Sequence, residues 1–238
     1  MGAICMNTRE LAGKFWIRCE TEMEHYRADT FYDKEPETLK WIESFQVGVF
    51  ADVGANIGIY SLYCAALHPE MAIYAFEPVK QNYDRLVDNI KLNGFTNIVA
   101  MNFAVGSVNG LTNIFLPETE IGKSGAQIHT PVDEHNKNFQ AKQVQQVMET
   151  TLDMWPDIDY LKIDVDGHEM DVLVGAGDSF NRLRSMLIEC NREKIDVQQI
   201  TDEFSKMGLF PDRRFNDLPN HSRYRRGGNP ENMVFSRA

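Results

Sequence analysis

The chain has 238 residues, of which 43% are hydrophobic and 25% charged, a composition typical of a folded soluble domain that excludes a disordered or fibrous chain. It carries 24 Lys and Arg residues against 35 Asp and Glu residues, which gives a formal net charge of −11. This charge repels a phosphate backbone, so we predict that nucleic acid is not a partner. A chain of this length buries enough surface to fold without disulfides or a structural metal.

No segment of the sequence has the properties of a membrane span or a secretory signal. No apolar run approaches the roughly 18 residues that cross a bilayer, and residues 1–6 lack a basic region followed by an apolar core. The four cysteines, Cys5, Cys19, Cys64 and Cys190, form no CxxC pair and are expected to be reduced thiols. We therefore expect a cytoplasmic protein that does not bind membranes.

From residue 36 onward, segments with helical spacing alternate with short apolar runs typical of strands. The spacing of apolar residues predicts helices over 36–46, 59–66, 79–92, 170–175 and 197–206. The apolar runs predict strands over 47–52, 72–76, 97–103, 160–165, 185–190 and 232–236. Strands that alternate with helices form parallel sheets through right-handed crossovers, which place helices on both faces. The predicted fold class is therefore α/β, with a doubly wound, mostly parallel sheet.

Apolar residues do not recur at helical spacing between residues 106 and 150. Short strands are predicted there over 111–116, 126–129 and 143–148, around a polar loop. We interpret 106–150 as an inserted β-hairpin region, and we expect its loop, 118–142, to form a mobile lid because long polar loops in compact domains are usually functional or disordered. With 1–46 as an N-terminal cap segment, the whole chain is predicted to be one domain.

Polar side chains stand where the predicted parallel strands end. Ligands of open α/β sheets bind beyond the carboxyl ends of the strands, so these residues are candidates for a binding site. They are Asp52, Glu77, Asn102, Asp164, Asp166 and Glu189. Acidic groups dominate this edge, which suits a cationic ligand.

A glycine turn follows the first predicted strand. Gly54 and Gly58 form a GxxxG pattern, whereas a dinucleotide fold expects GxGxxG, and Asp52 would face a pyrophosphate. Glu77, about 20 residues after the turn, stands where a carboxylate can accept the hydroxyl groups of a ribose. A nucleoside-bearing cofactor without a pyrophosphate explains both observations, and the alternative is a purely structural corner between strand and helix.

Three motifs resemble those of the class I S-adenosylmethionine-dependent methyltransferases, and specifically the FkbM-type family. They are residues 50–61 (FADVGANIGIYS), residues 75–78 (AFEP) followed by Asn82 and Tyr83, and residues 161–169 (LKIDVDGHE). The resemblance covers most of the chain. It implies a Rossmann-like, seven-stranded fold and S-adenosylmethionine as the cofactor, with a methyl group transferred to an oxygen of a small metabolite or sugar-like acceptor.

By the same resemblance, Glu77 would hold the ribose hydroxyls, 102–104 would border the adenine, and 52–56 would lie against the methionine moiety. Glu35 would reach the amino group of the cofactor, although an acidic residue at a helix start is also stabilising for structural reasons alone. The complete set of implied cofactor contacts is Glu35, Asp52, Gly54, Ala55, Asn56, Tyr60, Ser61, Glu77, Asn102, Phe103, Ala104 and Asp164.

The candidate catalytic residues are Lys162, Asp164 and His168. Alternation along a strand puts Lys162 and Asp164 on one side, and a lysine in a buried strand needs a partner, so it pairs with an acid such as Asp164 or Glu189 or else reaches substrate. His168 can accept a proton near neutral pH and is the candidate base for an acceptor hydroxyl. The alternative for His168 is a residue that begins a helix and bonds to backbone.

Two further clusters allow more than one interpretation. Asp164, Asp166, His168 and Glu189 are able to ligate a divalent cation, although we favour a site without metal. The second cluster is basic and either clasps an anionic substrate or forms a solvated surface loop; it consists of Arg213, Arg214, Arg223, Arg225 and Arg226.

Two alternative functions remain open at this point. One is a nicotinamide-dependent oxidoreductase, which the missing second glycine of the turn and the position of Asp52 disfavour. The other is a noncatalytic module that binds a cofactor. The sequence does not indicate an oligomeric state.

Overall fold

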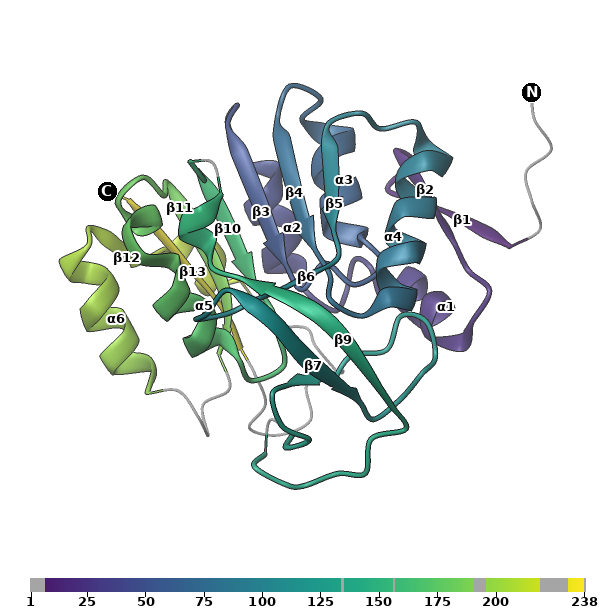
Figure 1. Ribbon diagram of the computed structural model, residues 1–238. Helices are drawn as coiled ribbons and strands as arrows, with labels where there is room; N and C mark the ends of the chain where they lie inside the picture. The colour runs from purple at the N-terminus through teal and green to yellow at the C-terminus, as the bar shows by residue number, and fades with distance from the viewer. Residues whose placement is uncertain (1–6, 134, 156, 191–195, 219–230, 238) are drawn as a thin grey trace.

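The computed structural model describes residues 7–133, 135–155, 157–190, 196–218 and 231–237. Its large sheet has seven strands in the order β12-β13-β11-β10-β3-β4-β5 (Figure 1). Their bounds are β3 (Val49–Val53), β4 (Ala72–Phe76), β5 (Ile98–Met101), β10 (Tyr160–Ile163), β11 (Ser185–Cys190), β12 (Leu209–Pro211) and β13 (Glu231–Arg237). Strand β13 runs antiparallel to both of its neighbours, and the other pairs are parallel, which confirms the predicted mostly parallel, seven-stranded sheet.

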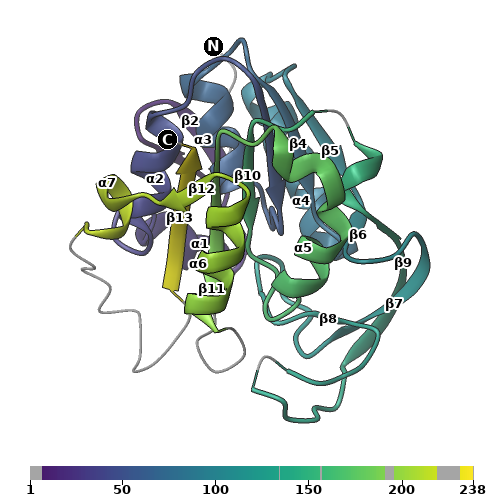
Figure 2. The same ribbon diagram turned by 90° about the vertical axis from the view of Figure 1, so that its left-hand side faces the viewer.

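Helices cover both faces of this sheet, as Figure 2 shows with α2 on one side and α5 on the other. The helices are α1 (Glu22–Asp29), α2 (Pro36–Glu43), α3 (Ile59–Leu67), α4 (Lys80–Asn93), α5 (Glu169–Ala176), α6 (Val197–Lys206) and α7 (Arg213–Asn216), with short 3-10 turns at Leu152–Met154 and Gly177–Asn181. Among the described residues, no helix is long and apolar enough to cross a membrane.

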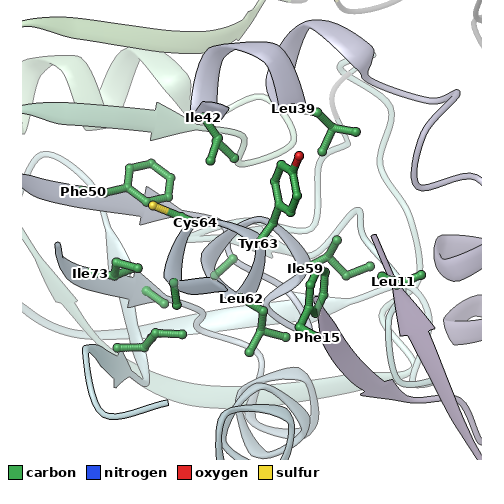
Figure 3. Packing of buried hydrophobic residues seen from close by; sticks show 14 of the residues in the cluster. Leu11, Phe15, Leu39, Ile42, Phe50, Ile59, Leu62, Tyr63, Cys64 and Ile73 are labelled. Atoms are coloured by element: carbon green, nitrogen blue, oxygen red, sulfur yellow. The ribbon is translucent and has the colours of Figure 1, made fainter. Parts of the chain in front are cut away.

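Alternation along the strands divides the core into two layers. In β3, Phe50 packs with Ile42 of α2 and Leu62 of α3 in the first layer, part of which is seen in Figure 3. The next residue, Ala51, belongs to the second layer, with Val172 of α5. Because side chains alternate between faces, this arrangement fixes which polar side chains at the strand ends meet on the α2 and α3 face.

A second, four-stranded sheet has the order β6-β9-β7-β8. Its strands are β6 (Phe103–Val105), β7 (Gly110–Leu116), β8 (Gln127–Ile128) and β9 (Gln143–Thr150). Strands β7 and β9 form the long antiparallel pair that the inserted-hairpin prediction required. The prediction of one strand over 97–103 is wrong, because the chain changes partner at Asn102: β5 pairs with β4, whereas Phe103 pairs with Met148 of β9.

Several elements were not predicted from the sequence. The N-terminal cap contains an antiparallel pair, β1 (Thr8–Leu11) and β2 (Phe15–Arg18), and helix α1 follows it with a capping box at Thr21 and Glu24. The edge strand β12 and the single turn α7 were also missed. These segments are short, and their apolar residues are too few to establish a period.

Candidate active site

A cavity opens beyond the carboxyl ends of β3, β4 and β10, between the large sheet, the small sheet and the N-terminal cap. It brings together most of the site residues predicted from the sequence. Those on its wall are Glu35, Gly54, Ala55, Asn56, Tyr60, Glu77, Phe103, Ala104, Lys162, Asp164 and His168. Its position is the one expected for a ligand of an open α/β sheet.

The glycine turn after β3 is shaped by close contact between strands. Gly54 has a φ of 83°, and a Cβ at this position would lie 1.8 Å from the carbonyl oxygen of Asp164. The N–H groups of Gly54 and Ala55 both donate to the carbonyl oxygen of Phe76, at 3.0 and 2.9 Å. The turn is therefore held between β4 and β10, and only glycine fits at its first position.

Glu77 presents a buried carboxylate to the cavity, with the residue only 4% exposed. Its two oxygens accept hydrogen bonds from the backbone N–H groups of Asn56 and Val79, at 2.8 and 2.9 Å. Burial raises the pKa of Glu77 to about 7, against the lowering effect of these two bonds. A carboxylate oxygen accepts more than one hydrogen bond, so both keep capacity for hydroxyl donors of a ligand.

Three predicted cofactor contacts lie behind the cavity wall. Ser61 donates to the carboxylate of buried Asp52 at 2.6 Å, and neither residue lines the cavity. Asn102 also stays off the wall and donates from Nδ2 to the carbonyl oxygens of Glu77 and Pro78, each at 2.9 Å. These side chains hold the loops that carry the lining residues.

Lys162 is almost completely buried and lies within an acidic network. Its Nζ is 2.8 Å from Asp164 Oδ2, 3.8 Å from Asp52 Oδ1 and 5.2 Å from the centre of the Tyr60 ring. Burial alone would lower the pKa of Lys162, but Asp164, Asp52 and Glu35 raise it above its usual range, so the ammonium stays charged. In return, Lys162 holds the pKa of Asp164 below its usual range despite burial, whereas burial dominates for Asp52 and raises its pKa.

Glu35 adds a second carboxylate from the start of α2. Its side chain is buried in the cavity wall, where Lys34 Nζ lies 2.7 Å from Oε1 and Thr38 donates to Oε2 at 3.2 Å. Burial opposes ionisation of Glu35, but the ammonium groups of Lys34 and Lys162 hold its pKa well below the usual range. The residue therefore offers a negative charge to a cation in the cavity.

His168 lines the cavity at the position before α5. Its Nδ1 lies 3.1 Å from Asp171 Oδ2, and its Nε2 lies 3.1 Å from the side-chain oxygen of Gln127. The amide nitrogen of Gln127 donates to the carbonyl oxygen of Asp166 at 2.9 Å, which sets the orientation of the amide. Both ring nitrogens thus face acceptor oxygens, and His168 can take a proton from a substrate only when Gln127 gives way.

Glu189 also lines the cavity, at the end of β11, and burial raises its pKa well above the usual range. Asp164, Asp166, His168 and Glu189 do not form a metal centre, because no group of three or more His, Cys, Asp or Glu side chains in the described part of the chain is arranged to hold a metal ion.

A segment that we call the strap, residues 120–126, crosses the cavity and contributes Lys123, Ser124 and Ala126 to its wall. Asn82 on α4 accepts from the N–H of Gly122 at 2.8 Å and donates to the carbonyl oxygen of Lys123 at 3.1 Å. The side chain of Asn56 donates to the same carbonyl at 3.0 Å. The strap is therefore bonded directly to α4 and to the loop after β3.

Two further bonds attach the strap elsewhere. The N–H of Gly125 donates to Asp166 Oδ2 at 2.6 Å, and Arg27 Nε of α1 donates to the carbonyl oxygen of Gly122 at 2.7 Å. Arg27, Gln127 and Lys123 were not predicted from the sequence as cavity or site residues. Asn82, within the quoted motif, and the glycines of the strap were the available signals.

Part of the basic cluster is resolved into ordinary ion pairs. Arg214 pairs with Asp212 at 2.5 Å, and Arg213 pairs with Asp217 at 3.2 Å. Neither arginine lines the cavity. Arg223, Arg225 and Arg226 lie outside the described residues.

The fold is that of the class I S-adenosylmethionine-dependent methyltransferases. The Methyltransferase FkbM domain matches residues 52–212, more than half of the sequence, and the chain belongs to this family. It is accordingly an S-adenosylmethionine-dependent methyltransferase, which confirms the motif-based prediction of fold, family and activity. The alternatives of a nicotinamide-dependent oxidoreductase and of a noncatalytic module are set aside.

The chain is similar to several named proteins. It is 25% identical over 198 residues to "Hexuronic acid methyltransferase AglP" of Haloferax volcanii, covering 83% of this chain and 78% of that one. It is 26% identical over 170 residues to "Methyltransferase sdnD" of Sordaria araneosa, covering 58% and 64%. Among solved structures, M. jannaschii TYW2 in complex with AdoMet aligns with a TM-score of 0.47 at 15% identity, covering 97% of this chain and 86% of that one.

Proposed function

We propose that this methyltransferase acts on an oxygen of a small, sugar-like acceptor, with His168 as the general base. The observation that carries the proposal is the polar end of the cavity, where His168 and Asp166 stand beside the acidic network of Lys162 and Asp164. One relative is named a hexuronic acid methyltransferase, which supports a sugar-like acceptor.

The residues of the cavity fit S-adenosylmethionine. The buried carboxylate of Glu77 is suited to the ribose hydroxyls, and Glu35 supplies a fixed negative charge for the amino group. Asp52 Oδ1 is buried without a hydrogen bond from any described residue, so the negative charge around Lys162 is not fully compensated within the network. When bound, the cofactor supplies a methyl group on a positively charged sulfur, and this surplus of negative charge favours such a cation.

The proposed catalytic roles divide between binding charge and moving a proton. Lys162 and Asp164 hold each other in a fixed position at the wall and keep the acidic edge of the cavity charged. Because the carboxylate of Asp164 is held by this ion pair, it is not free to attack the methyl group of the cofactor. His168 accepts the proton of the acceptor hydroxyl once the acceptor replaces its contact with Gln127. A carboxylate acceptor would already be ionised and would not need this step, so dependence on His168 also reports the acceptor class.

The test is His168→Asn, assayed by single-turnover transfer of an isotopically labelled methyl group to a mixture of sugars and sugar acids. We expect a loss of roughly 10²–10⁴-fold in rate with a hydroxyl acceptor, and S-adenosylmethionine affinity close to that of the wild type. His25→Asn, an exposed site on α1, is the matched control. A variant that keeps the full rate and the same pH profile would assign the base to Asp164 or Glu189 instead.

A further inference from the structure

A second group of polar side chains lies beyond His168, on the inner face of the small sheet, and is not part of the cavity wall. It consists of His129 after β8, Glu149 on β9 and Thr112 on β7. The rings of His129 and His168 lie edge to face, with their centres 6.4 Å apart. This group therefore adjoins the proposed base.

Glu149 is a buried carboxylate whose space is provided by a glycine. Its side chain has no exposed surface, and neither oxygen accepts a hydrogen bond from a described residue. A Cβ on Gly106 would lie 2.1 Å from Oε1, so any larger residue at 106 would displace the carboxylate. The nearest basic group is His129, whose Nε2 lies 3.3 Å from Oε2. A buried carboxylate without hydrogen bonds is costly, and one beside a polar cavity is a candidate functional group.

His129 joins this buried carboxylate to the solvent. Its side chain is 42% exposed, and its Nδ1 lies 3.2 Å from the hydroxyl oxygen of Thr112. Its backbone has a φ of 64°, in the left-handed region that non-glycine residues rarely adopt. Such strain persists only where the surrounding structure holds it, and here it keeps the imidazole between Glu149 and His168.

We infer that His129, with Glu149 beside it as a positioning residue, carries the reaction's proton from His168 to the solvent; this inference rests on the proposed function. When a hydroxyl acceptor is methylated, its O–H bond breaks, an O–CH3 bond forms, and the electron pair of the S–CH3 bond remains on sulfur. The released proton passes to His168. In the proposed path a water molecule carries the proton from His168 to His129, and the exposed edge of His129 passes it to the solvent.

A buried carboxylate lies beside His129, the ring that receives the proton. The titratable groups in contact with His129 are Glu149 from β9 and His168, the residue before α5. Glu149 stabilises the imidazolium that forms for a moment on His129, in the way that a buried carboxylate supports a catalytic histidine in other enzymes. Thr112 holds the opposite nitrogen, so the ring cannot turn away.

The experiment compares the wild type with His129→Ala and Glu149→Gln, using turnover of a hydroxyl acceptor as a function of pH and of added imidazole. We expect His129→Ala to lose about 10²-fold in rate, to bind S-adenosylmethionine as tightly as the wild type, and to regain rate as the imidazole concentration rises. Glu149→Gln removes the carboxylate beside His129, so the pH dependence of its turnover is expected to differ from that of the wild type. His25→Ala serves as the control for removal of an exposed histidine.

The outcomes separate this inference from the proposed function. A wild type without methyl transfer to any oxygen acceptor would refute the proposed function itself. A wild type that is active, together with a folded His129→Ala variant of equal rate and equal pH profile, would overturn the proton path alone. Lost activity that imidazole does not restore, in a variant with a normal melting temperature, would also overturn it, because only a missing proton carrier is replaced by a soluble base.

Discussion

Cofactor affinity should depend on pH through the carboxylate of Glu77. Its pKa is raised by burial from an ordinary value of 4.5 to about 7, so in the free protein the group ionises within the neutral range. A ribose hydroxyl donates more strongly to the ionised form, and binding should therefore strengthen as pH rises. With a pKa near 7, the ionised fraction grows about tenfold between pH 6 and pH 8, and the affinity for S-adenosylmethionine should grow by about the same factor.

The sign of the accompanying stability change follows from the same shift. Between pH 4.5 and about 7 the folded protein retains a proton that the unfolded chain has lost, so the free energy of unfolding contributed by Glu77 falls as pH rises through this window. Below 4.5 both states are protonated, and above about 7 both are ionised, so the contribution is constant outside it. A bound cofactor whose hydroxyls donate to the carboxylate offsets part of this loss.

Calorimetry on the wild type and on Glu77→Gln tests the argument. The amide keeps the size of the side chain but removes one acceptor oxygen and the charge, so affinity at pH 8 should fall by about 10- to 150-fold, corresponding to about 1.5–3 kcal/mol. At pH 6 the difference should be about tenfold smaller, because the wild type is then mostly neutral. Equal affinity in the folded variant, or a difference that does not change with pH, would refute the assignment of Glu77 to the ribose.

Three other perturbations have expected results. Gly54→Ala should lower the free energy of unfolding, measured in denaturant, by about 3 kcal/mol or more, because the added Cβ meets a carbonyl oxygen. Gly94→Ala is the control: φ is also positive there, but the Cβ enters open space, so the cost should be only about 1–2 kcal/mol. Lys162→Met should cost about 3–5 kcal/mol by leaving buried carboxylates unpaired, and Asp164→Asn in the same protein should recover part of it. Asn82→Ala should release the strap, seen as faster amide hydrogen exchange at residues 122–125; unchanged exchange would contradict a role for Asn82 in holding it.

The elements of the large sheet could be predicted because each of them has a long or strongly apolar pattern. Helix α4 begins and ends within one residue of its predicted bounds, and its stop at Gly94 adopts the left-handed conformation expected of a helix end. The break at Asn102 could not be predicted. Residues on both sides of it are equally apolar, and the strand is divided by the arrival of β9, which is distant in sequence.

The predicted site residues fall into two groups for a physical reason. Positions in the loops after the strands, such as Gly54 and Glu77, reach the cavity because the carboxyl ends of parallel strands meet there. Asp52 lies within β3 and Asn102 directly after β5, yet their side chains turn to Ser61 and to backbone carbonyls instead. A motif identifies the segment that approaches a ligand, whereas tertiary packing decides which of its side chains is exposed to it.

The strap explains why the surroundings of His168 are harder to predict from the sequence than those of Glu77. Asp166 receives the N–H of Gly125 on its carboxylate and the amide of Gln127 on its carbonyl, and Gln127 contacts His168. An acceptor that displaces Gln127 from His168 must therefore also disturb Asp166 and, through it, the strap, whose other end is bonded to Asn56 beside Glu77. The proposed release of His168 from Gln127 is therefore coupled to the strap through Asp166, so a change in the strap is expected to alter acceptor choice and cofactor retention together.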